Sequence, residues 1–186
     1  MHIGVCMYKN IANSLAYRVI SGGPLVCIFT KSSKDVPDGM TAAWSCPYDP
    51  DVLLLVLDKN HTTSENIRHT KQFVVAIPSN SQKNTALELG SVHGRNVGNK
   101  LEVKHIKTEK SQNFGFDVMS DALAYFECEL QDEQLFSDKG ICLSKVLNVY
   151  VKSDMWDDNQ ECFNPGFIST LHHVTGSTFY SGGELV

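Results

Sequence analysis

The sequence has no basic excess and no long hydrophobic run. Its 186 residues include 16 basic and 21 acidic side chains, which gives a net charge of −5 with histidine neutral. Proteins that neutralise nucleic-acid phosphates usually carry a basic excess, so this balance argues against a nucleic-acid partner. The longest aliphatic run, Val52 to Leu57, has about a third of the length that a membrane-spanning helix needs. We therefore expect neither a nucleic acid nor a membrane as a partner.

Clustered cysteines and an export signal are also lacking. The six cysteines are widely scattered and form no C-x-x-C pair, and a chain of this length can bury a core without disulfides. The apolar stretch Met1 to Tyr8 has no basic region before it and no small-residue cleavage site after it. We expect a single cytoplasmic domain over residues 1–186 with reduced thiols.

The common catalytic and metal-binding signatures are absent. There is no G-x-G-x-x-G after a strand, no Walker loop and no G-x-S-x-G elbow, and the four-residue spacing of Gly90, Gly94 and Gly98 matches none of them. His172 and His173 are adjacent, and neighbours on a strand point to opposite faces, so they would chelate a metal poorly. The other cysteine and histidine spacings are wider than zinc sites use. The sequence thus indicates no metal site and no catalytic side chain.

Apolar runs bounded by turn-forming residues predict a sheet. Two continuous runs, Leu25–Thr30 and Phe73–Ile77, are typical of strands buried on both faces. Met40–Ser45 and Val52–Leu57 are further strand candidates. Turns are expected between them at Pro37-Asp38-Gly39 and at Cys46 to Pro50. Ala124–Leu130 and Leu147–Val151 alternate apolar with polar residues, which predicts a long antiparallel hairpin joined through Ser137–Gly140. Such a pattern favours an antiparallel sheet that closes into a barrel.

Helix signals are few. A short helix or arm is expected around Ile11 to Val19. Thr62 and Glu65 stand three residues apart, as in a capping box, and start a helix that ends on basic residues. Ser79 to Gln82 can cap a further helix over Thr85 to Val92. The sequence therefore predicts a mainly β (α+β) fold with a few short helices.

The start of the Thr62 helix is a candidate phosphate site. This helix directly follows a buried strand, so its free N–H groups and its dipole suit a phosphate. The hydroxyls of Thr62, Thr63 and Ser64 and the charge of Lys59 would assist. The alternative is that these hydroxyls only cap the helix, as serine and threonine commonly do at this position.

Five segments together resemble the flavin reductase-like proteins with an FMN-binding split β-barrel, which include the flavoredoxins. In chain order they are Pro24-Leu25-Val26, Pro37–Trp44 (similar to P-N-x-M-T-x-x-W), Lys59–Ile67 (x-T-x-E-x-I), Phe73–Ile77 (F-V-V-N-x) and Ser91–Lys100 (S-G-R-x-x-D-K). The similarity covers about residues 22–183 and is best over 24–103. Asp38 stands where the family often has Asn, and Asn99 stands where Asp is common.

The resemblance implies a division of the chain and a set of cofactor contacts. Residues 1–21 would form an arm, 22–152 the barrel, and 153–186 a segment that completes the barrel or a homodimer interface. FMN would lie along the barrel near that interface. The residues implied at the flavin ring are Asp38, Gly39, Met40, Thr41, Ala43 and Ser45, and those around the phosphate are Lys59, His61, Thr62, Thr63, Arg95 and Lys100. Trp44 is expected in the core and is left out of the site.

Three functions are compatible with this reading. The first, implied by the resemblance, is an oxidoreductase that takes a hydride from NADH or NADPH onto FMN and reduces a free flavin or a partner protein. The second is a flavoredoxin-type electron carrier that holds FMN without oxidising a nicotinamide. The third is a non-redox binding module for another phosphorylated ligand, favoured by the negative charge of Asp38. No residue in the sequence separates the first two.

Overall fold

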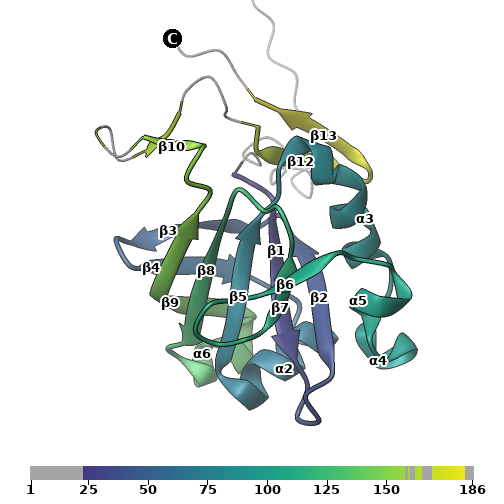
Figure 1. Ribbon diagram of the computed structural model, residues 1–186. Helices are drawn as coiled ribbons and strands as arrows, with labels where there is room; N and C mark the ends of the chain where they lie inside the picture. The colour runs from purple at the N-terminus through teal and green to yellow at the C-terminus, as the bar shows by residue number, and fades with distance from the viewer. Residues whose placement is uncertain (1–22, 158, 160–161, 165–168, 183–186) are drawn as a thin grey trace, which may run out of the picture.

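Seven antiparallel strands form one curled sheet (Figure 1). The structure, a computed structural model, describes residues 23–157, 159, 162–164 and 169–182; the arm expected around Ile11 to Val19 lies outside them. In spatial order the strands are β2 (Pro37–Ala42), β1 (Val26–Lys31), β5 (Gln72–Ile77), β8 (Ala124–Leu130), β9 (Ile141–Val151), β4 (Val52–Val56) and β3 (Ser45–Asp49).

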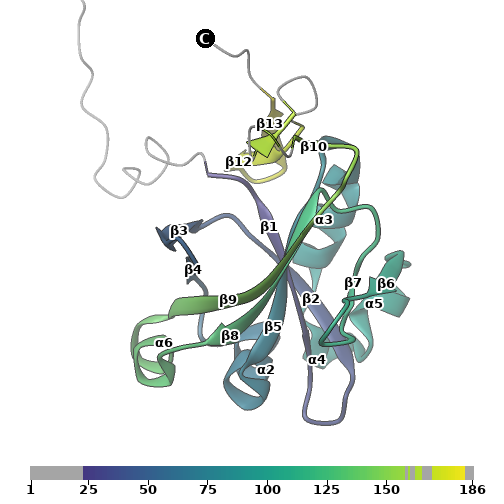
Figure 2. The same cartoon turned by 60° about the vertical axis from the view of Figure 1, so that its left-hand side comes forward.

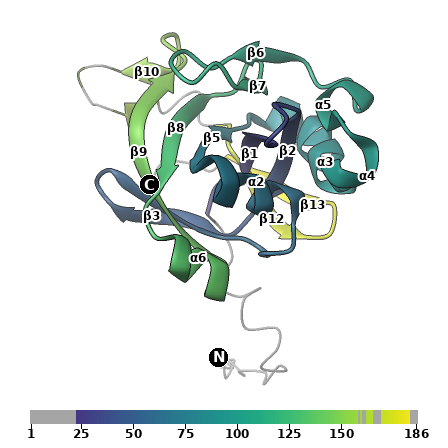
Figure 3. The same cartoon turned by 90° about the horizontal axis from the view of Figure 1, so that it is seen from below.

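The chain connectivity forces this sheet to curl. Its two edge strands, β2 and β3, are separated along the chain by Ala43 and Trp44 alone, so the two edges must approach each other. The amide of Val56 in β4 donates to the carbonyl of Trp44 at 3.0 Å. This hydrogen bond holds the two-residue link against β4, the strand next to the edge strand β3. Seen from below, the sheet wraps around its own interior (Figure 3). The predicted antiparallel split β-barrel is confirmed.

Helices cover one end and one side of the curl (Figure 1). They are α2 (Thr62–Thr70), α3 (Lys83–Ser91) after the 3₁₀ turn η2 (Asn80–Gln82), α4 (Gly94–Val97), α5 (Lys100–Val103) and α6 (Glu133–Lys139). The two helices predicted from capping signals are present. The expected loop at Ser137–Gly140 is instead the end of α6, which Asp132 caps by accepting from the Leu135 amide at 2.8 Å. Helices of one or two turns are too short to produce a periodic pattern, which explains why α4, α5 and α6 were missed.

Three small strand pairs complete the described chain. They are β6 (Thr108–Lys110) with β7 (Asp117–Met119), β10 (Trp156–Asp157) with β11 (Cys162–Phe163), and β12 (Leu171–Thr175) with β13 (Thr178–Ser181). The β12–β13 hairpin lies at the start of β1 (Figure 2), where the Leu25 amide donates to the Leu171 carbonyl at 2.7 Å. Within the described residues, no helix has both the length and the apolar character needed to cross a bilayer.

Of the two turns predicted near β2 and β3, the first was wrong and the second is confirmed only at Pro50. Pro37-Asp38-Gly39 belongs to β2, and the turn precedes it, where the Ser32 hydroxyl accepts from the Val36 amide at 3.2 Å. Pro37 is the first residue of an edge strand, a position where its missing N–H removes no ladder bond. Cys46 to Asp49 similarly pairs with β4, with a register shift after Pro47. Edge strands tolerate the proline that reads as a turn in sequence.

Alternate residues of β1 enter two different cores, as a strand buried on both faces requires. Cys27 and Phe29 pack on the side of α3 and β7, whereas Val26 and Ile28 pack inside the curl with Phe136 of α6. Burial raises the pKa of Cys27 to about 12, so its thiol is held neutral.

Candidate functional site

A buried lysine joins three elements beside β2. Lys100, at the start of α5, is 2% exposed, and its ammonium group donates to the carbonyls of Gly39 in β2 at 2.6 Å and of Leu89 in α3 at 3.2 Å. Its third partner is Oδ1 of Asp38, 3.3 Å away. A buried ammonium group is costly unless paired, and here three oxygens compensate it. Lys100 therefore fixes α3 and α5 against β2.

The carboxylate of Asp38 extends this connection to α2. It is 3% exposed, and its Oδ2 accepts a hydrogen bond from the Thr63 hydroxyl at 2.8 Å. Its Oδ1 faces Lys100 without a well-directed hydrogen bond. Gly94 of α4 packs so closely that a Cβ at that position would lie 2.3 Å from this oxygen. Asp38 thus lies behind the site, enclosed by Thr63, Lys100 and Gly94.

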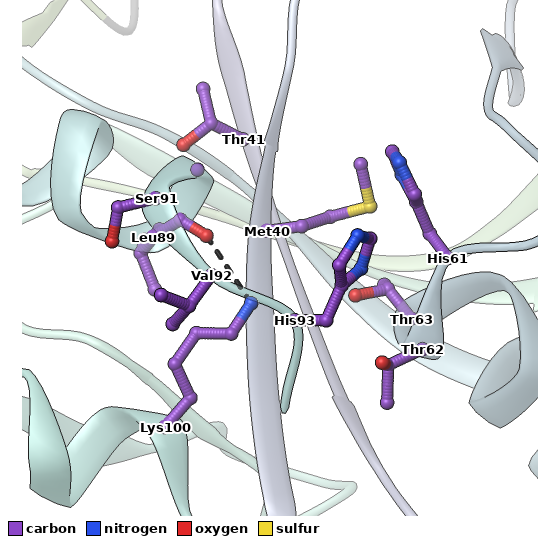
Figure 4. A pocket seen from close by; sticks show the side chains of 11 residues that line it. Met40, Thr41, His61, Thr62, Thr63, Leu89, Ser91, Val92, His93 and Lys100 are labelled. Carbon is purple, nitrogen blue, oxygen red and sulfur yellow. Dashed lines mark hydrogen bonds between the residues drawn. The ribbon is translucent and has the colours of Figure 1, made fainter. Parts of the chain in front are cut away.

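In front of this network is a polar hollow of about 150 Å³ between β2, the start of α2 and the α3–α4 connection (Figure 4). Its lining residues are Met40, Thr41, His61, Thr62, Thr63, Leu89, Gly90, Ser91, Val92, His93 and Lys100. No carboxylate lines it. Hydroxyls, two imidazoles and one ammonium group are a donor set suited to an anion.

The hydroxyls at the start of α2 make tertiary contacts. The N-cap residue is His61, whose side chain makes no cap hydrogen bond, so the predicted Thr62–Glu65 capping box was wrong. Thr62 accepts from the Arg95 amide at 3.3 Å and from its Nε at 3.2 Å, and Ser64 donates to the Asp58 carbonyl at 2.8 Å. The amides of the first turn have no intrahelical partner. This favours the anion-binding interpretation over the capping alternative.

A larger and more apolar hollow of about 440 Å³ adjoins the first and shares Met40, Thr41 and His61 with it. Its further lining residues are Ala42, Ala43, Trp44, Val56, Leu57, Asp58, His173 and Val174. Trp44 is 52% exposed, so its expected place in the core was wrong; it lies on the two-residue link between the sheet edges. Together the two hollows form a groove along β2, polar at α2 and apolar beyond it.

The predicted site residues divide by position. Those that line the groove are Met40, Thr41, Ala43, His61, Thr62, Thr63 and Lys100. Asp38 and Gly39 lie behind it, and Arg95 reaches it through Thr62. Two residues lie elsewhere: Lys59 is exposed and does not line the groove, and Ser45 lines a separate apolar hollow and donates to the Pro24 carbonyl at 3.1 Å.

Sequence reasoning missed several lining residues. Ser91 and His93 lie in the segment Ser91–Lys100, but the sequence analysis gives them no role in the site. Their position close to Arg95 in the sequence is a signal that could have found them. His173 was considered only as a metal ligand, and the hairpin β12–β13 brings it to the apolar part of the groove. Among the described residues, no group of three or more His, Cys, Asp or Glu side chains could hold a metal ion.

Electrostatics favour a neutral His61 before any anion binds. Burial lowers its pKa, the nearby charge of Asp58 opposes this, and the neighbouring His93, Lys100 and Arg95 lower it further. The net direction is downward from its ordinary value.

The fold and the groove define a split-barrel protein whose anion-suited hollow adjoins an apolar one. Residues 20–172 match the sequence model of the family described as the flavin reductase like domain, and the chain belongs to this family. It is 28% identical over 176 residues to the uncharacterized protein YddH of Escherichia coli K12, covering 92% of this chain and 93% of that protein.

Two solved structures share the fold. The flavoredoxin of Desulfovibrio vulgaris (Miyazaki F) superposes with a TM-score of 0.81 at 21% identity, covering 97% of this chain and 96% of the other. An FMN-binding domain of a flavin reductase-like enzyme from Shewanella baltica OS155 gives a TM-score of 0.78 at 23% identity, covering 95% and 94%.

The contact between Gly94 and Asp38 gives a testable prediction. Gly94→Ala should lower the free energy of unfolding by about 1–3 kcal/mol, because the new methyl group must displace a buried, ion-paired carboxylate. Gly90→Ala is the matched control: its Cβ would meet only Thr41 at 3.9 Å, and alanine in a helix should leave stability unchanged or raise it by up to about 1 kcal/mol. Urea denaturation of both variants measures the difference; equal stabilities would contradict the close packing.

Proposed function

We propose that the protein binds one FMN per chain in the groove along β2 and works as an NAD(P)H:flavin oxidoreductase. The observation that carries this is the pairing of the polar hollow at α2 with the apolar hollow beside it, in a member of the flavin reductase-like family. A phosphate at the end of a flat, largely apolar ring system needs such a two-part site. The donor set and the shape therefore fit FMN.

The phosphate would be held at the polar end. The first-turn amides of α2 and the hydroxyl of Thr62 supply hydrogen-bond donors, and Arg95 supplies a positive charge beside Thr62. Lys100 contributes less charge than sequence reasoning assumed, because Asp38 and two carbonyls already engage its ammonium group.

The flavin ring would lie against the backbone of β2. This strand pairs with β1 alone in the sheet, so the outer backbone groups of Thr41 to Ala43 are free of ladder bonds and can meet the polar edge of a ring. The small side chains of Ala42 and Ala43 leave room for close approach. When bound, FMN supplies a reversible two-electron redox centre, which no side chain of the groove offers.

The alternative is a flavoredoxin-type electron carrier that uses the same groove without a nicotinamide substrate. Structural relatives from Desulfovibrio vulgaris and Methanosarcina acetivorans carry the name flavoredoxin, which supports this alternative. The third reading, a non-redox module, rested on the charge of Asp38. Since that carboxylate is paired with Lys100 and Thr63 behind the groove, it gives no support for a different ligand.

Anaerobic mixing separates the reductase from the carrier. FMN-loaded protein is mixed with NADH and then with NADPH while the flavin absorbance is followed, with free FMN at the same concentration as the control. We expect rapid bleaching with at least one donor. Bleaching by dithionite but by neither nicotinamide would reject the reductase and leave the carrier.

Thr62→Ala tests the phosphate end. The loss of its hydroxyl and of the anchor for Arg95 should weaken FMN binding by about 1–3 kcal/mol, the range for a hydrogen bond to a charged partner. Riboflavin, which has no phosphate, should be affected much less. Fluorescence quenching titrations with both ligands measure this, and equal losses would contradict a phosphate site at Thr62.

A homodimer is the further expectation. Inside the open side of the curl is an apolar hollow of about 260 Å³, lined in part by Leu55 and Phe126. Val149, the register partner of Phe126, is 52% exposed, and Tyr48 on β3 is 64% exposed. Exposed apolar area of this kind marks an interface, and a two-fold dimer is the commonest way to bury it. Light scattering should give the mass of two chains; the mass of one chain would contradict this.

A further inference from the structure

Two histidines face each other across the polar hollow. His61 is the N-cap residue of α2, and His93 directly precedes α4. Their ring centroids are 5.1 Å apart at an interplanar angle of 58°, and Figure 4 shows both rings close to the Met40 side chain. Both rings line the hollow, so an anion that enters it meets two imidazoles.

Charged groups of both signs surround this pair. Lys100 is paired with Asp38 behind the hollow, Arg95 donates to the Thr62 hydroxyl, and Oδ2 of Asp58 lies 3.9 Å from Nε2 of His61. His173 lines the adjoining apolar hollow together with His61. A dianion in this hollow therefore meets the partial positive charge of the α2 N-terminus and the charge of Arg95 beside Thr62.

We propose that His61 and His93 together form a proton-linked clamp for the phosphate of FMN, in which the pair takes up about one proton as the dianion binds. The inference rests on the proposed function, since it takes FMN as the ligand. It assigns a binding role to His93 and makes the affinity for FMN, but not for riboflavin, depend on pH.

The physical reason is that a bound phosphate makes the electrostatic potential at the imidazoles more negative. In the free protein, burial and then the neighbouring positive groups, opposed by Asp58, hold the pKa of His61 below its ordinary value. A bound dianion favours the charged form of an imidazole beside it and so raises the pKa of His61. A group whose pKa rises on binding strengthens binding below its free-state pKa and loses that contribution as pH rises through the bound-state pKa. The dissociation constant for FMN should therefore rise by up to about tenfold per pH unit through this range.

Calorimetry tests the proton directly. FMN and riboflavin are each titrated into the protein at pH 7.5, where the flavin phosphate is already a dianion, in phosphate-free buffers of different ionisation enthalpy. The dependence of the observed heat on the buffer gives the number of protons taken up. We expect about one proton per FMN and none per riboflavin.

Three variants identify the groups. His61→Gln and His93→Gln should each lower the proton uptake on FMN binding, and the double variant should abolish it. His69→Gln is the matched control, because His69 lies exposed in the last turn of α2, at the opposite end from the hollow, and should keep the full uptake. Thermal melting verifies that each variant is folded.

The outcomes are distinguishable. FMN that binds without proton uptake overturns the clamp and leaves the proposed function intact. Uptake that persists in the folded double variant also overturns it, because another group must then carry the proton. FMN that does not bind at all overturns the proposed function and the clamp with it.

Discussion

The ammonium group of Lys100 organises the groove. It is buried, and its carbonyl partners belong to β2 and α3, while its ion partner Asp38 also holds Thr63 at the start of α2. Removing one partner from such a buried pair typically costs about 3–5 kcal/mol, since the other charge is left uncompensated. One ion pair thus sets the positions of four elements, and the walls of the polar hollow follow from it.

The course of the chain makes β2 available to a ligand. A sheet whose edge strands are joined by two residues has to curl, and it leaves β2 with a single neighbouring strand. Helices α3, α5 and α2 contact this strand. An edge strand is usually a liability that other chains can pair with. In this protein the exposed edge becomes the floor of a groove.

Most strands of the main sheet and the two longest helices could be predicted from sequence, because runs such as Phe73–Ile77 and the Ser79 cap carry strong local signals. The edge strand β3 and the three small strand pairs could not. The roles of individual site residues could not. Asp38 and Lys100 are far apart in sequence, and only the fold shows that they neutralise each other. Trp44 was misassigned because a tryptophan near a strand usually packs inward, whereas it lies on the link between the two edges. His93 was overlooked because its partner across the hollow comes from another element.

The central claim is that FMN binds along β2 with its phosphate at the start of α2. A crystal structure of the protein with FMN tests this most directly. The account predicts phosphate oxygens within hydrogen-bond distance of the Thr62 hydroxyl and of the first-turn amides, with the flavin ring against the backbone of Thr41 to Ala43. A phosphate bound elsewhere, or a ring seated in the apolar hollow inside the curl, would contradict it.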